Sequence, residues 1–247
     1  MSESPPRSGF LRDLRSVALR GMRPARSLAR DARGIAAVEF ALILPLMLMI
    51  YLGLVELSRS LRAAQKLDLV AHSLADLAAQ QLTCATSTIS ACLTEADMQA
   101  IFSTATALMT GLPVTPATNL KMTISQVEVY SPAANQWRAR VNWSAPKNSA
   151  TSRACGDLMV APSGTKPVSY TTMPATYTTP SSGEDPVTGP VIVADVIYTY
   201  SPGINFEIFK WSSPPTWSMQ RTSYAPVRNT FTPNRIDYNG TTGTECP

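Results

Sequence analysis

Residues Phe40–Val55 read FALILPLMLMIYLGLV, a run without a single charged side chain. With its apolar flanks the run extends over Ile35–Leu57. An α-helix rises about 1.5 Å per residue, so this stretch predicts a helix of roughly 34 Å, enough to cross a hydrocarbon core of about 30 Å. Glu39 and Glu56 lie near its ends, where a carboxylate costs less than at the centre, and Pro45 is tolerated in a membrane helix. We therefore expect a transmembrane helix over residues 35–57.

Two other kinds of segment share features with this stretch. A buried core helix is disfavoured because so long an apolar run is rare in soluble domains. A cleaved secretory signal has the same order of a basic and then an apolar region. However, the stretch is long for such a signal, and no clear A-x-A site follows Leu57.

The residues before the span are strongly basic. Eight arginines lie between Met1 and Arg33 against three acidic residues, whereas the whole chain has a net charge of only +4. Basic flanks stay in the cytoplasm, which predicts a cytoplasmic leader over residues 1–34 and an exported domain after the span. A mitochondrial transit peptide has a similar composition, but it is not normally followed by such an anchor. A membrane flank also explains the basic charge without nucleic acid as a partner.

The sequence at the start of the span forms a specific pattern. Arg33–Pro45 reads RGIAAVEFALILP: a basic residue, a glycine, a glutamate five positions later and a proline within the apolar run. Gly53–Leu57 reads GLVEL and is followed by a helical stretch that contains Asp68. Over about residues 33–80 the chain resembles TadE/TadG-like proteins of the bacterial tight-adherence (Tad, Flp-type) pilus system.

This resemblance implies a non-enzymatic minor pilin, pseudopilin or assembly component. It implies the bacterial inner membrane as the location, with a cytoplasmic N-terminus, a periplasmic C-terminal domain and, for subunits that enter a fibre, the pilus. The implied partners are other Tad pilins, inner-membrane secretion components and a prepilin peptidase. The alternative is an unprocessed inner-membrane-anchored scaffold or envelope-binding protein.

The same resemblance implies a cleavage site. Some members are cut after a glycine like Gly34, which would leave Ile35 as the first residue, whereas others keep the leader, and both outcomes stay open here. A glycine offers the peptidase a narrow backbone, and a basic leader is held at the anionic inner leaflet. The new amine at Ile35 could then pair with Glu39 of a neighbouring subunit, because a buried ion needs a partner. Otherwise Glu39 is a glutamate that reaches water at the interface, as we also interpret Glu56.

Beyond the span, apolar residues recur every three or four positions through residues 57–80, which predicts an amphipathic helix that continues the span as a type IV pilin-like stem. Its apolar stripe begins with Leu57 and Leu61 and could equally pack on the chain's own domain. Thr94 is a candidate N-cap for a second helix, Glu95–Met109. Residues 58–112 are therefore expected to form an exported stem and a helical hairpin.

In residues 113–247 the helical spacing gives way to alternation of apolar and polar residues. We therefore predict a β-rich periplasmic domain here. Strands are expected over 120–124 and 137–143 as a hairpin, and over 191–200 and 217–224. Residues 144–190 look like a long irregular insertion, and the chain from Ala225 looks loop-like. The expected fold class is α+β, with a small antiparallel sheet and long loops.

All four cysteines follow the span: Cys84, Cys92, Cys155 and Cys246. An even number on the exported side predicts two disulfides. Cys84–Cys92 and Cys155–Cys246 are the natural pairs, although three connectivities are possible. A metal site is the alternative, but the chain has no C-x-x-C and only one histidine, His72.

Catalysis is not expected, nor is a cofactor. His72 would have to serve any Ser-His-Asp or Cys-His site, and it is predicted on a helix surface. Ser163–Lys166 matches S-x-x-K, the nucleophile spacing of penicillin-binding enzymes, but no helical pattern follows it. An anchored envelope enzyme that uses this loop is the third hypothesis after the pilin and the scaffold.

Overall fold

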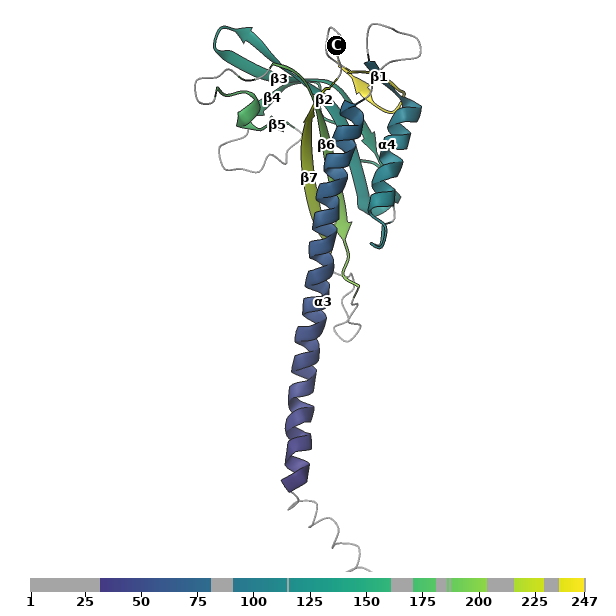
Figure 1. Ribbon diagram of the computed structural model, residues 1–247, viewed down its shortest axis with the longest axis vertical. Helices are drawn as coiled ribbons and strands as arrows, with labels where there is room; N and C mark the ends of the chain where they lie inside the picture. Colours follow the sequence, from purple (N-terminus) through teal and green to yellow (C-terminus); the bar gives the residue numbers. More distant parts are fainter. Residues whose placement is uncertain are drawn as a thin grey trace, which may run out of the picture. The chain divides into compact units, whose positions relative to one another are not determined.

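A computed structural model describes residues 32–80, 91–114, 116–160, 171–180, 186, 188–203, 216–228 and 236–246. The chain divides into two compact units, Met1–Val55 and Glu56–Pro247. The helices are α3 (Ala32–Ala79), α4 (Glu95–Leu108) and the short α5 (Pro116–Asn119), with a 3-10 turn η1 (Ala175–Tyr177) (Figure 1). The strands are β1 (Ala91–Thr94), β2 (Leu120–Ala133), β3 (Gln136–Lys147), β4 (Gly156–Val160), β5 (Thr172–Met173), β6 (Gly189–Tyr200), β7 (Trp217–Pro226), β8 (Ile236–Asn239) and β9 (Thr244–Glu245).

Helix α3 is 48 residues long and accommodates Pro45 in its interior. From Ala63 onward it buries small and apolar residues every three or four positions, so the amphipathic prediction is confirmed for this part. Leu57 and Leu61, with which the predicted apolar stripe begins, are exposed and do not pack on the domain. They lie on a different helix face, because the buried face is the one that carries Leu67 and Leu74.

Helix α4 begins where the sequence predicted. Thr94 is its N-cap: the side-chain oxygen accepts from the amide of Asp97 at 3.2 Å, and the Asp97 carboxylate accepts from the amide of Thr94 at 3.0 Å. This capping box fixes the first turn, and the helix buries Met98, Ile101, Phe102 and Ala105.

The predicted helical hairpin is not clear in the described residues. The four residues directly before α4 form strand β1, which pairs in parallel with β8. The backbone N–H and C=O groups of Ala91–Thr94 pair with those of β8. They are therefore not available for the short turn that a helical hairpin would need before α4. Residues 81–90, with Cys84, lie outside the described residues.

The sheet is larger than predicted, curled and mixed. Its strand order is β5-β4-β3-β2-β6-β7, and β9 pairs with β3. The central pairs β2–β3, β2–β6 and β6–β7 are antiparallel, as expected, whereas β4–β5 is parallel. Strands β4 and β5 come from the predicted irregular insertion, and β8 and β9 come from the tail that was predicted to be a loop.

Both faces of the sheet are covered. One face packs on α3 and α4 around Leu67, Phe102 and Ile124. The opposite face forms a second buried cluster, in which Val127 of β2 lies together with Leu158 of β4 and Met173 of β5. Because most strands are buried on both faces, they lack the simple alternation of a half-exposed sheet.

Candidate functional site

The apolar part of α3 forms the first candidate site. It meets the length and composition of a membrane-crossing helix, and none of its most apolar window is buried. Gly34, Ile35 and Glu39 lie in its first turns and are exposed, Ile35 by 61%. A Cβ built on Gly34 would meet no atom within 4 Å. The backbone at the predicted cleavage position is therefore sterically accessible within the described residues, although a peptidase would have to unwind this helical turn.

Glu56, the first residue after the apolar run, holds two distant parts of its own unit together. Its Oε2 accepts from the phenol of Tyr200 at 2.7 Å, and its Oε1 accepts from the amide of Gly203 at 3.1 Å. Arg59, one turn later, donates to Oε1 at 3.3 Å. Only 15% of the Glu56 side chain is exposed. We call these four residues the Glu56 clamp.

The clamp changes the chemistry of its tyrosine. Burial, together with the hydrogen bond to the Glu56 carboxylate, raises the pKa of Tyr200 to about 12. Tyr200 therefore remains a neutral donor over the physiological range. Our interpretation of Glu56 as an ordinary interfacial residue missed these contacts, which join residues more than 140 positions apart.

A second polar cluster is buried between the β3–β4 connection, which carries Arg153, and strands β6 and β7, which carry Asp195 and Thr222. Arg153 Nε and Nη2 donate to the two carboxylate oxygens of Asp195 at 2.9 and 3.0 Å, and Thr222 donates to the same carboxylate at 2.6 Å. Arg153 and Asp195 are each only 1% exposed. Burial raises the pKa of Asp195, and the adjacent guanidinium opposes that effect. With no access to solvent, this pair is structural.

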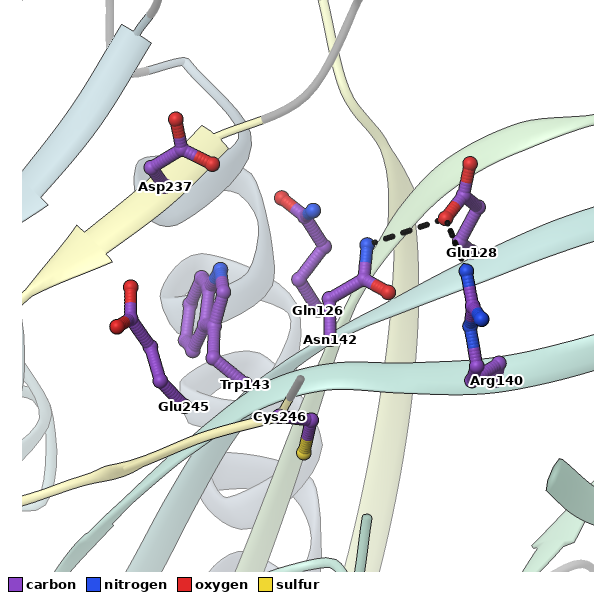
Figure 2. A pocket seen from close by; sticks show the side chains of 8 residues that line it. All are labelled: Gln126, Glu128, Arg140, Asn142, Trp143, Asp237, Glu245 and Cys246. Atoms are coloured by element: carbon purple, nitrogen blue, oxygen red, sulfur yellow. Dashed lines mark hydrogen bonds and ion pairs between the residues drawn. The ribbon is translucent and has the colours of Figure 1, made fainter. Parts of the chain in front are cut away.

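A shallow pocket of about 260 Å³ lies beside a β-bulge (Figure 2). The β2–β3 register shifts between Gln126 and Val127, which leaves Asn142 as the extra residue on β3. Asn142 donates to Glu128 at 3.5 Å, and Arg140 pairs with the same carboxylate at 3.6 Å. The other lining residues are Gln126, Trp143, Asp237, Glu245 and Cys246.

This pocket has no catalytic arrangement. Cys246 is disulfide-bonded and so is not a nucleophile, while Trp143 donates its indole N–H to the carbonyl of Ile236 at 2.7 Å. Among the residues that the structure describes, no group of three His, Cys, Asp or Glu side chains could hold a metal ion.

The catalytic candidates from the sequence are not brought together. His72 is exposed on α3, as predicted, and its Nδ1 lies 2.9 Å from the hydroxyl of Ser223. Ser223 is 3% exposed, so this contact attaches the helix to β7 and presents no nucleophile to solvent. Ser163–Lys166 lies outside the described residues.

Cys155 and Cys246 form a disulfide with a Cα–Cα distance of 5.4 Å. It is one of the two pairs that the sequence favoured, and it attaches the C-terminal segment to the start of β4. Cys92 is disulfide-bonded as well. Its predicted partner, Cys84, lies outside the described residues.

The N-terminal part of the chain is similar to a known protein family. Residues 34–76 match a family model described as TadE-like protein. A search of curated proteins and a search of solved structures gave no match. The matched segment contains Gly34, Glu39 and Glu56, so it includes the predicted cleavage position and the acidic residue of the clamp.

Proposed function

From its TadE-like segment, residues 34–76, we propose that this chain is a non-enzymatic component of a bacterial tight-adherence pilus system, a minor pilin or pseudopilin. The family match carries the proposal. An exposed apolar helix of membrane-crossing length, followed in the same chain by a folded domain, supports it. In this role the protein works by association: its helix binds lipid or other pilin helices, and its domain contacts other subunits.

The proposed topology has a cytoplasmic leader and a periplasmic domain. The arginine-rich segment before Gly34 favours this orientation. The Cys155–Cys246 disulfide supports it independently, because disulfides persist in the periplasm and are rare in the reducing cytoplasm.

Cleavage between Gly34 and Ile35 would convert the anchored chain into a subunit that can leave the bilayer. The new amine would lie at the end of an apolar helix, about one turn from Glu39. Both charges would be poorly solvated in a fibre interior, so pairing the amine of one subunit with Glu39 of its neighbour would offset their burial. The proposed partners are therefore other pilins, together with a prepilin peptidase and inner-membrane secretion components.

The second candidate is an unprocessed, inner-membrane scaffold. It is favoured by the packing of α3 from Ala63 to Ala79, because the buried face of this stretch is occupied by the chain's own domain. On this alternative the leader is retained and the apolar helix serves only as an anchor.

N-terminal sequencing separates the two candidates. The full chain, tagged at its C-terminus, is expressed with and without its cognate prepilin peptidase, extracted from membranes and sequenced. A peptidase-dependent start at Ile35 supports the pilin, whereas an intact leader in both cases favours the scaffold. Gly34→Leu should abolish the cut. Gly53→Leu is the matched control, since a Cβ at either glycine meets no atom within 4 Å.

A further inference from the structure

We propose that the end of the domain beside Glu56 rests in the lipid headgroup layer, with Leu57, Leu61 and Trp217 as the residues that contact lipid. This inference rests on the proposed membrane anchor and adds a lipid contact beyond the apolar run Phe40–Val55. We call these three residues the lipid-facing rim.

Trp217 lies at the level of the helix where the apolar run ends. Its ring centroid is 4.8 Å from that of Tyr200, whose hydroxyl is 2.7 Å from Glu56. Tyr200, at the end of β6, is also the register partner of Trp217, at the start of β7 (Figure 1). Two short contacts therefore connect Trp217 to the residue that directly follows Val55.

The rim is exposed although it is apolar. The exposed fractions are 54% for Leu57, 56% for Leu61 and 42% for Trp217. Leu57 and Leu61 are one helical turn apart and thus share a face, whereas Glu56 belongs to the buried face of Leu67 and Leu74. The clamp holds one side of the helix to the domain while the rim leaves apolar side chains uncovered.

The depth of these residues fits the headgroup layer. With the middle of the apolar run Phe40–Val55 at the bilayer centre, a rise of about 1.5 Å per residue places Leu57 roughly 14 Å and Leu61 roughly 20 Å from that centre. The hydrocarbon core is about 30 Å thick, and the bilayer with its headgroups is about 40–45 Å thick. The hydrocarbon thus ends about 15 Å from the centre and the headgroups about 20–22 Å from it, so Leu57 lies at the edge of the hydrocarbon and Leu61 in the headgroup layer.

Composition favours lipid over a second copy of the chain. Tryptophan and tyrosine are enriched at this depth because their rings are apolar and their polar atoms reach water. Arg59 and Arg62 are exposed on the same turns, where a lipid phosphate would be a complementary partner.

Fluorescence quenching by lipid tests the contact. The full chain is reconstituted into nanodiscs holding one copy each, made of phosphatidylethanolamine and phosphatidylglycerol, with or without bromines near the headgroup end of the acyl chains. The chain has four tryptophans, so the signal of Trp217 is taken as the difference between wild type and Trp217→Phe. Trp137→Phe, on β3 near the β2–β3 turn, is the matched control.

Trp217→Phe should remove the larger part of the bromine-dependent quenching, and Trp137→Phe should not. Equal quenching of wild type and Trp217→Phe in single-copy discs would overturn the proposal. Retention of the chain in the disc reports on the anchor separately, and N-terminal sequencing reports on pilin processing. The rim can thus fail while the anchor and the proposed pilus role stand.

Discussion

The phenol of Tyr200 donates to Oε2 of Glu56 at 2.7 Å across 144 positions of sequence. This single bond joins the end of β6 to the residue at which α3 stops being apolar. Gly203 adds its amide to the same carboxylate at 3.1 Å, and a Cβ in its place would lie 2.6 Å from the guanidinium of Arg59. A side chain at position 203 would therefore displace the exposed end of Arg59 from the clamp.

Tyr200→Phe should loosen the clamp without unfolding the domain. A hydrogen bond to a charged group contributes about 1.5–3 kcal/mol when buried, and this one is partly exposed, so we expect a loss of about 1 kcal/mol. The amide of Gly203 should then exchange its hydrogen roughly fivefold faster, because exchange follows the local opening free energy. Hydrogen exchange with mass spectrometry, on the full chain in detergent micelles, measures this rate.

Tyr198→Phe is the control for this change. Its hydroxyl donates to the carbonyl of Pro113 at 3.3 Å and does not reach Glu56. Unchanged exchange at Gly203 in Tyr200→Phe, or the same increase in Tyr198→Phe, would show that the tyrosine does not hold the clamp.

Local signals in the sequence were sufficient for the two long helices, α3 and α4, whereas the four-residue α5 was not predicted. The apolar run of α3 and the Thr94–Asp97 capping box depend on residues within one or two turns, so both could be predicted. The long strands β2, β3, β6 and β7 were found as well, because each contains an apolar or alternating stretch longer than a turn.

Features that depend on distant partners could not be predicted. Strands β8 and β9 have four and two residues, too few for a periodic signal, and they exist through pairing with β1 and β3. The partners of Glu56 lie 144 and 147 positions away. Only its place at the end of the apolar run, next to a family-like GLVEL segment, could have marked it out.

Acid should weaken the attachment of the C-terminal segment to α4. Glu95 accepts hydrogen bonds from Gln99, Thr242 and Tyr238, which lower its pKa from 4.5 to about 2. A carboxyl with a lowered folded pKa adds stability that is complete above the unfolded value and is lost as the pH falls through the folded value. The stability from Glu95 should therefore decline between about pH 4.5 and pH 2.

Glu95→Gln should remove this contribution and flatten the dependence of the unfolding midpoint on pH in that window. Thr242→Val removes one of the donors and should give an intermediate slope. Thermal unfolding of the full chain in micelles, followed by circular dichroism, measures the slope. If the unfolding midpoint of Glu95→Gln still depends on pH as steeply as that of the wild type, other carboxyl groups cause the dependence.

Replacing one residue of the buried Arg153–Asp195 pair should lower the free energy of unfolding more than replacing both. Asp195→Asn leaves the Arg153 guanidinium buried without its counter-ion, and breaking such a pair costs about 3–5 kcal/mol. Replacing both partners, as Arg153→Met with Asp195→Leu, removes the stranded charge and should cost less. Urea unfolding of the full chain in micelles gives the two free energies.

An exposed pair provides the control for that experiment. Asp68 lies 3.1 Å from Arg221, with side-chain exposures of 60% and 37%. Asp68→Asn should cost under about 1 kcal/mol, since surface ion pairs contribute little. A cost for Asp195→Asn as small as for Asp68→Asn would mean that water reaches Arg153 in solution.

The Cys155–Cys246 disulfide links stability to topology. It closes a loop of 91 residues, so the chain-entropy relation gives about 4–5 kcal/mol as an upper estimate for its removal, with 2–5 kcal/mol typical. Cys246→Ser should therefore lower the urea midpoint clearly. In intact membranes, both thiols should resist maleimide until a reductant is added, because the periplasm is oxidising. Labelling of the untreated chain at Cys155 and Cys246 would place the domain in a reducing compartment and contradict the proposed orientation.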